Sequence, residues 1–227
     1  MAFELSGVVP WGRSYAEYVA MFALSDEDLK RRILGCGDGP AAFNAGLTGR
    51  GGSVVSVDPL YAFSADDIRR RIAETTPSIM EQTRRNVHEF VWEQIRSIDE
   101  LATIRSSAME AFLADYPAGI EEGRYVAESA PRLSFPDGSF GLALVSHFLF
   151  LYSDHLDLGF HIDTITELCR ICGEVRVFPL LKMGATLSPH VAPVMDHFSG
   201  AGYEVGTMRV AYEFQRGGNQ MLRVRAR

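Results

Sequence analysis

The sequence predicts a doubly wound α/β domain built on a mostly parallel sheet. Three observations favour this class: short apolar strands alternate with helical stretches, a glycine-rich loop follows the first strand, and an acidic residue ends the second. Strands that are apolar along their whole length are typical of parallel sheets covered by helices on both faces. Because no repeat, low-complexity tract or long linker divides the chain, we expect one domain over residues 1–227.

The composition indicates a soluble globular protein and argues against a nucleic-acid partner. The formal net charge is −7, and the arginine clusters at 69–71 and 84–85 fall in helical stretches, where we interpret them as solvated helix faces. Residues 1–10 lack the basic start of a signal peptide, and the longest apolar run is too short to cross a membrane. We therefore expect a cytoplasmic protein without a membrane partner.

The first half of the chain is predicted to contain two strands and a helical insert. Residues 32–34 and 53–57 have strand character, and the second of these segments is β-branched and ends at Asp58. The stretch that follows has helical periodicity, with a helix start expected at Pro77. The resulting insert, at about 62–122, is longer than one crossover helix requires.

The second half is predicted to continue the alternation and to close with an antiparallel pair. Strand character returns at 124–127, 142–145, 174–178, 203–205 and 221–224. Helices are expected between the second and third of these segments and again at 189–199. The last two strands flank a glycine-containing turn at 216–219, so we expect them to pair with each other.

The cysteines do not indicate redox or metal chemistry. Cys169 and Cys172 form a lone C-x-x-C at the end of an expected helix, whereas a reactive thiol is favoured at a helix start. A zinc site would need two further ligands, and no paired Cys or His spacing supplies them. We interpret these cysteines as packing residues and expect no metal site.

Residues 35–40 form the most informative segment. We expect Gly35 to permit the turn out of the first strand, and Gly37 and Gly39 to let a ligand lie directly on the backbone. Pro40 is expected to begin a helix whose free N–H groups suit a carboxylate or phosphate. Asp58 would stand beside this loop at the carboxyl edge of the sheet, where a carboxylate can accept both hydroxyls of a ribose.

The glycine loop alone leaves the ligand open. Residues 37–42 also fit the dinucleotide pattern G-x-G-x-x-A, so a nicotinamide-dependent oxidoreductase is one alternative. Counted from Gly35, where the strand ends, the third position of that pattern is Pro40, which departs from it. A glycine-rich turn that binds nothing is a further alternative.

Four motifs, in order, resemble those of the class I S-adenosylmethionine-dependent methyltransferase family. They are the glycine loop, Val57-Asp58, the run Leu133-Ser134-Phe135-Pro136-Asp137-Gly138-Ser139-Phe140 leading into Leu142-Ala143-Leu144-Val145, and the turn from Leu168-Cys169-Arg170 to Gly173-Glu174-Val175. The resemblance covers most of residues 30–180 and is to an uncharacterised bacterial subgroup, which indicates no particular substrate. It implies a Rossmann-like, seven-stranded sheet and S-adenosylmethionine as the cofactor, with the ribose on Asp58.

The cofactor-binding residues expected at this sheet edge come from the loop, the second strand and the later strand ends. They are Gly35, Cys36, Gly37, Gly39, Asp58, Pro59, Glu128, Ser129, Ser146 and His147. Two positions depart from the family pattern, and the proline of the family's L-R-P-G-G turn is also missing before Gly173. Ser129, beside Glu128, stands where the family often has an acid that contacts adenine, and Gly141 replaces an acid after Ser-Phe. These departures leave a non-catalytic protein that binds the cofactor in a structural or regulatory role as an alternative.

His147 is the candidate catalytic residue, because it follows a strand that ends at the expected site. We expect its pKa near the working pH, which would suit a base or a substrate-orienting group; a structural histidine is the alternative. The resemblance and the acidic charge together favour methyl transfer to a small-molecule substrate. Trp11 and Tyr15 either close over the cofactor or pack in the core. The insert forms either a cap over the substrate side or a contact in a homo-oligomer.

Overall fold

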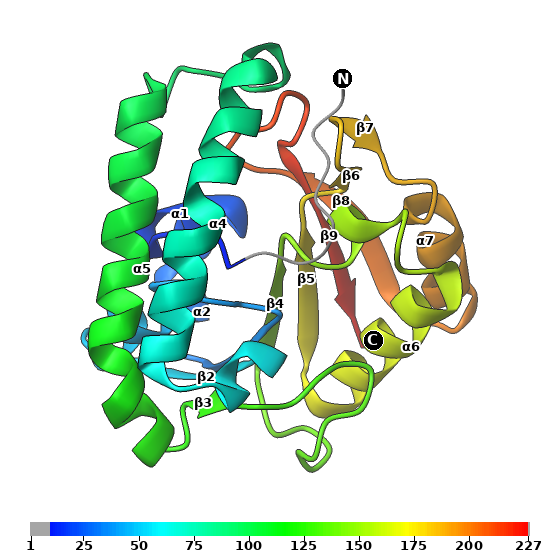
Figure 1. Cartoon of the computed structure of the whole chain (residues 1–227). Helices are drawn as coiled ribbons and strands as arrows, with labels where there is room; N and C mark the ends of the chain where they lie inside the picture. The colour runs from blue at the N-terminus through cyan, green and yellow to red at the C-terminus, as the bar shows by residue number, and fades with distance from the viewer. Residues whose placement is uncertain (1–9, 227) are drawn as a thin grey trace.

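A seven-stranded sheet between helical layers forms the centre of the computed structural model, which describes residues 10–226 (Figure 1). The strands are β1 (Arg32–Cys36), β2 (Ser53–Val57), β3 (Tyr125–Val126), β4 (Leu142–Ser146), β5 (Glu174–Phe178), β8 (Glu204–Arg209) and β9 (Gln220–Arg225). Their order is β3-β2-β1-β4-β5-β9-β8. Strands β1 to β5 pair in parallel, and β9 is antiparallel to both β5 and β8. The predicted sheet and its closing antiparallel pair are confirmed; the signal-peptide interpretation concerns residues 1–9, which lie outside the described range.

Helices cover both faces of this sheet, with α6 and α7 on the opposite side from the other helices (Figure 1). The helices are α1 (Tyr15–Met21), α2 (Asp26–Leu29), α3 (Phe43–Thr48), α4 (Ala65–Arg85), α5 (Ile98–Glu121), α6 (Leu158–Ile171) and α7 (Val191–Gly200). Short 3-10 turns, η1 (Pro59–Ala62), η2 (Val87–Glu89) and η3 (Phe150–Tyr152), and a small hairpin, β6 (Leu181–Lys182) and β7 (Thr186–Leu187), complete the chain. Within residues 10–226, no helix combines the length and the apolar character that a membrane span requires.

The two faces of β1 show why the sheet is buried on both sides. Successive strand residues point to opposite faces. Ile33 therefore packs in a cluster with Phe43 of α3, whereas Leu34 packs in a second cluster with Ile165 of α6. The three central strands, β1, β4 and β5, are buried along most or all of their length for this reason.

The segment between β2 and β3 is helical, but its first helix begins before the expected position. Helix α4 starts after the N-cap Ser64 and carries Pro77 in its interior, so the prediction of a helix start at Pro77 was wrong. Proline removes one backbone hydrogen bond. Locally, the Thr76 hydroxyl donates to the Ile72 carbonyl at 2.7 Å. The cap at Ser64 and the burial of Ile68 favour the longer helix despite the proline.

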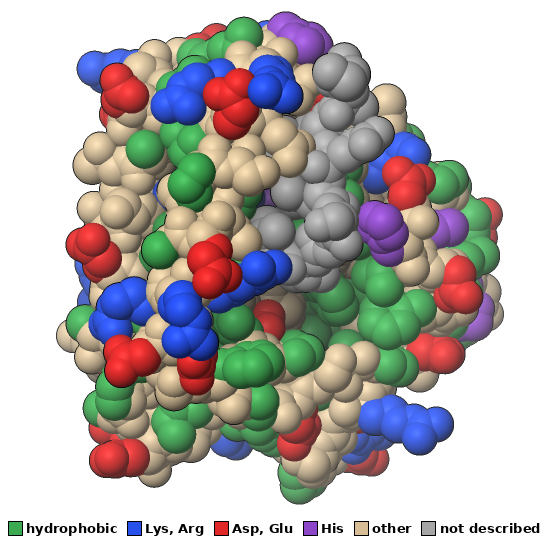
Figure 2. All heavy atoms as spheres, in the orientation of Figure 1, with side chains coloured by type: hydrophobic (Ala, Val, Ile, Leu, Met, Phe, Trp, Pro, Cys, Tyr) green, Lys and Arg blue, Asp and Glu red, His purple; other side chains and the backbone are tan. Residues whose placement is uncertain are grey.

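The arginine clusters lie on exposed helix surface among acidic side chains. Arg69 pairs with Asp66, and Arg85 pairs with Glu81 one turn earlier in the same helix. Figure 2 shows Lys and Arg side chains next to Asp and Glu side chains over this part of the molecule. Such pairs three or four residues apart are ordinary on a solvated helix face, which supports that interpretation of the clusters.

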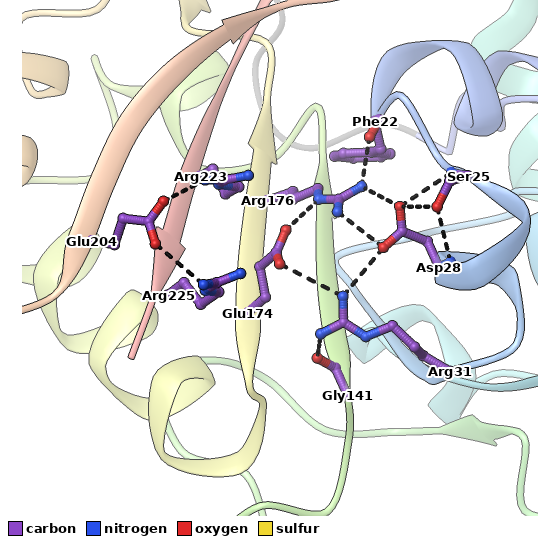
Figure 3. A network of polar contacts seen from close by, with 10 residues as sticks. All are labelled: Phe22, Ser25, Asp28, Arg31, Gly141, Glu174, Arg176, Glu204, Arg223 and Arg225. Atoms are coloured by element: carbon purple, nitrogen blue, oxygen red, sulfur yellow. Dashed lines mark hydrogen bonds and ion pairs between the residues drawn. The ribbon is translucent and has the colours of Figure 1, made fainter. Parts of the chain in front are cut away.

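A network of charges joins α2 to the amino end of β5 (Figure 3). Arg176 pairs with Asp28 and Glu174, and Arg31 contacts the same two carboxylates. Arg31 also donates to the Gly141 carbonyl, and a Cβ added at Gly141 would lie 3.0 Å from Arg31 Nε. The glycine that departs from the family pattern therefore makes room for Arg31. Because it precedes β4, it lies at the end of that strand away from the carboxyl edge.

Candidate functional site

The glycine loop and the tip of β2 meet at the carboxyl edge of the sheet. The Gly39 N–H donates to Asp58 Oδ2 at 2.9 Å, and the Gly37 N–H donates to the Val57 carbonyl at 2.9 Å. The Tyr61 hydroxyl donates to the Gly39 carbonyl at 2.8 Å. Gly37 and Gly39 have φ angles of 71° and 52°, which residues with side chains rarely adopt. The loop and the carboxylate thus form one continuous surface.

Asp58 keeps capacity to accept further hydrogen bonds. Its Oδ1 accepts the Leu60 N–H at 2.8 Å, and its Oδ2 accepts the Gly39 N–H. Each carboxylate oxygen has a second lone pair, so each can also accept a hydroxyl. Burial raises the pKa of Asp58, although the two N–H groups oppose this effect. A vicinal diol, such as that of a ribose, fits this pair of acceptors.

Two expectations about the loop are wrong. Gly35 lies inside β1 without a positive φ, and its missing side chain instead leaves space for Asp38. Pro40 does not begin a helix, because α3 starts only at Phe43. Residues 40–42 lie between the loop and α3, so the helix begins three residues later than expected.

Asp38 is a buried carboxylate of the loop that the sequence analysis did not select. Its Oδ1 accepts the Tyr18 hydroxyl at 2.8 Å, and its Oδ2 accepts the Ser56 hydroxyl at 2.7 Å. Burial raises the pKa of Asp38 to about 6, even though these two hydrogen bonds favour the ionised form. Asp38 therefore connects α1, the glycine loop and β2 from within.

A cavity extends from the glycine loop to the insert and to the connection between β8 and β9. Of the predicted cofactor residues, those that line it are Gly37, Gly39, Asp58, Ser146 and His147, and those that do not are Gly35, Cys36, Pro59, Glu128 and Ser129. Lining residues that the sequence analysis did not select as site residues include Arg13, Tyr18, Asp38, Leu101, Arg105, Phe178, Tyr212 and Phe214. Residues far apart in the sequence therefore line the same cavity.

Glu128 and Ser129 are engaged with their own loop. Glu128 Oε2 accepts the Ser134 N–H at 2.9 Å, and the Ser129 hydroxyl contacts the Ala130 carbonyl at 3.3 Å. Neither residue borders the cavity, and their contribution to an adenine site stays a prediction.

His147 is held at the end of β4 with its imidazole beside the cavity. Its backbone N–H donates to the Phe178 carbonyl at 2.7 Å, its ring Nδ1 lies 3.0 Å from the Ser146 hydroxyl, and its φ is 52°. Burial, followed by the charges of Arg13 and Arg105, holds the pKa of His147 well below its ordinary value. The expectation of a pKa near the working pH is therefore wrong, because the buried, positively charged surroundings favour the neutral imidazole.

A buried ion pair lies beside the cavity on the side of the insert. Arg105 of α5 is 1% exposed, and its Nη1 donates to both carboxylate oxygens of Glu17 at 2.7 and 2.6 Å. The Tyr212 hydroxyl donates to Glu17 Oε1 at 2.8 Å. Burial alone would raise the pKa of Glu17, but Arg105 and Arg13 outweigh it and lower the pKa to about 2. Glu17 thus links α1, α5 and the β8–β9 connection as a full anion.

Trp11 and Tyr15, the two aromatic residues for which two roles were expected, have different surroundings in the structure. Trp11 lines the cavity, as a segment closing over a ligand would require. Tyr15 instead stacks on Phe43 with ring centroids 5.7 Å apart, and the Arg50 guanidinium lies over its ring, 4.2 Å from the centroid. Tyr15 therefore belongs to the packing of α1 on α3.

The strand order, the loop after β1 and the acid at the tip of β2 define the Rossmann-like fold of class I S-adenosylmethionine-dependent methyltransferases. The magnesium protoporphyrin IX methyltransferase ChlM of Synechocystis PCC 6803, with bound SAH, is similar at a TM-score of 0.50 and 10% identity, over 92% of this chain and 80% of that chain. The PH0226 protein of Pyrococcus horikoshii OT3 is similar at a TM-score of 0.46 and 11% identity, over 87% and 82%. At 10% identity, the likeness to ChlM shows the fold alone.

A full-length relative shows the family. The chain is 31% identical over 224 residues to the uncharacterized protein MJ0045 of Methanocaldococcus jannaschii, and the alignment covers 98% of each protein. The chain belongs to the same family as MJ0045. No protein-family model matches it.

Proposed function

We propose that this protein is an S-adenosylmethionine-dependent methyltransferase that acts on a small-molecule acceptor. The observation that carries the proposal is the hydrogen bond between the Gly39 N–H and Asp58 Oδ2, which joins a side-chain-free backbone surface to a carboxylate in one cavity. The methyltransferase fold supports it. When bound, the cofactor supplies a methyl group activated by a sulfonium. Asp58 accepts the ribose hydroxyls, and the loop at Gly37 and Gly39 carries the amino-acid end.

The remaining cavity residues support a role in positioning an acceptor. His147 is neutral at pH 7 and a weak base, so we assign it to orienting the acceptor and not to removing a proton. Methyl transfer gains much of its rate from holding the nucleophile in line and excluding water. We assign the insert to the substrate side as a cap, because Ile79 and Thr83 of α4 and Leu101 of α5 line the cavity.

Calorimetric titration with S-adenosylmethionine and with S-adenosylhomocysteine (SAH) tests this proposal. We expect Asp58→Asn to weaken both affinities roughly 10- to 100-fold, because a charge-assisted hydrogen bond is lost. Asp66→Asn is the matched control, since Asp66 is an exposed carboxylate on α4 and should leave both affinities unchanged. If the wild-type protein binds neither compound at high micromolar concentration, the proposal is wrong.

Transfer itself needs a separate measurement. Incubation with methyl-labelled cofactor and a pool of small metabolites should place label on at least one acceptor, and Asp58→Asn should reduce that incorporation. Cofactor binding without any labelled acceptor would instead favour the non-catalytic alternative. Tight binding of NADH in the same cavity would favour an oxidoreductase.

A further inference from the structure

The cavity wall formed by α5 and the segment before α1 carries an excess of positive charge. Two guanidinium groups, those of Arg13 and Arg105, face one carboxylate, that of Glu17, and His147 beside them is neutral. Burial and the nearby Arg105 lower the pKa of Arg13 to about 10, so it remains charged at neutral pH. Burial would lower the pKa of Arg105, but Glu17 outweighs this effect and raises it.

Arg105 presents one complete edge without a partner. Its Nη1 is used by Glu17, whereas its Nε and Nη2, both buried, have no hydrogen-bond partner among residues 10–226. Arg13 Nε is likewise without a partner in that range. Buried cationic donors left unpaired are costly, so such donors in a cavity point to an anionic ligand group. The Nε–Nη2 edge of a guanidinium matches the two oxygens of a carboxylate.

Apolar side chains from several elements line the same cavity as Arg105. Leu101 lies one turn before Arg105 on α5, Ile79 lines the cavity from α4, and Trp11 and Phe214 are also among the lining residues. A ligand that fits both features has a carboxylate at one end and an apolar or aromatic body.

We propose that the methyl acceptor is a small carboxylic acid with an apolar body, and that its carboxylate binds the Nε–Nη2 edge of Arg105. This inference rests on the function proposed above. Arg105 belongs to the insert, and its partners Glu17 and Tyr212 belong to α1 and the β8–β9 connection, whereas the cofactor is assigned to the loop and Asp58. The carboxylate acts as an anchor and leaves the reacting atom unspecified.

The test compares charged and neutral probes on the protein saturated with SAH. Benzoate, phenylacetate and 4-phenylbutanoate are each titrated beside the matching amide. We expect at least one acid to bind about 10-fold or more tightly than its amide, since a bidentate charge-assisted contact is worth roughly that factor. The neutral amide keeps the shape and removes the charge, so the ratio reports the anchor.

Three variants separate anchoring from structural support. Arg105→Gln alone leaves Glu17 buried without its partner, so the double variant Glu17→Gln/Arg105→Gln, which removes both charges, is used; it should abolish the preference for acids. Glu17→Gln alone leaves the charge of Arg105 without its neutralising carboxylate and should increase the preference, an effect that a merely structural ion pair would not produce. Arg69→Gln, an exposed arginine on α4, is the control and should change nothing.

The outcomes are distinguishable from failure of the proposed function. If SAH binds but no acid is preferred over its amide, or if the double variant keeps the preference, the carboxylate anchor is wrong while cofactor binding stands. If the double variant loses SAH affinity to the same extent, Arg105 serves the carboxylate of the cofactor, and the inference is also wrong. If the wild-type protein does not bind SAH, both the proposed function and the carboxylate anchor are wrong.

Discussion

The carboxyl group of Asp38 fills the space beside Gly35 that a side chain would need. A Cβ added at Gly35 would lie 1.7 Å from Asp38 Oδ2. Because the Asp38 side chain is turned back toward Gly35 of β1, it reaches the hydroxyls of Tyr18 and Ser56. The first glycine of the motif is therefore required by a neighbouring carboxylate, and the ligand-facing backbone begins only at Gly37.

Substitution of Gly35 should disturb this arrangement. Gly35→Ala forces Asp38 away from both hydroxyl partners, and we expect the free energy of unfolding to fall by about 2–4 kcal/mol from overpacking and lost buried hydrogen bonds. Urea denaturation measures it. Gly206→Ala in β8 is the control, since a Cβ there meets nothing within 4 Å. Equal stabilities of the two variants would contradict this explanation of Gly35.

Asp38 should make stability depend on pH with a defined sign. Burial raises its pKa to about 6 from 3.8, so between these values the folded protein binds more protons than the unfolded chain. The free energy of unfolding therefore decreases as pH rises through this window. Relative to Asp38→Asn, which does not titrate, the wild-type protein should lose about 2 kcal/mol between pH 4.5 and 7.5. Denaturation curves at four pH values measure the difference; parallel trends would show that Asp38 has an ordinary pKa.

The charge network of Figure 3 should contribute far more to stability than an exposed pair one residue away. Asp28→Asn leaves Arg176 and Arg31 with one carboxylate fewer, and breaking such a buried pair costs about 2–4 kcal/mol. Glu27→Gln removes only the exposed contact with Lys30 and should cost less than about 0.5 kcal/mol. Thermal and urea unfolding compare the two variants, and a similar cost for both would exclude a special role for the network.

His147 should stay neutral where a free histidine titrates. Because burial and then Arg13 and Arg105 hold its pKa well below the ordinary 6.5, its ring-nitrogen NMR shifts should not change between pH 8 and pH 6. Free histidine in the same buffer gives the reference curve, and the missing signals in His147→Gln assign the resonances. A midpoint near 6.5 would restore His147 as a candidate general base.

Local sequence signals predicted the features that depend on contiguous residues. The loop and Asp58 could be predicted because a parallel sheet brings the ends of adjacent strands to one edge. The proline signals at Pro40 and Pro77 were less informative, because proline restricts its own φ without deciding where a helix starts. At α4, the cap at Ser64 and the burial of Ile68 favour the earlier start.

The charged wall of the cavity could not be predicted in this way. Arg105 is 88 residues from Glu17, and Tyr212 is 195 residues from it. No spacing rule connects such positions, and an arginine inside an amphipathic helix ordinarily indicates a solvated face. Only the folded arrangement shows that Arg105 is buried and lines a cavity.

Glu17 also ties completion of the cavity wall to the synthesis of the last strands. Its carboxylate holds one group from the middle of the sequence and one from near its end. A ribosome-bound chain that has released only β1 to β4 already contains the loop and Asp58 but lacks Tyr212, so the arginine wall is still unfinished. A ligand that binds there stabilises only the fully folded protein. It therefore opposes local unfolding of α1, of α5 and of the last strands.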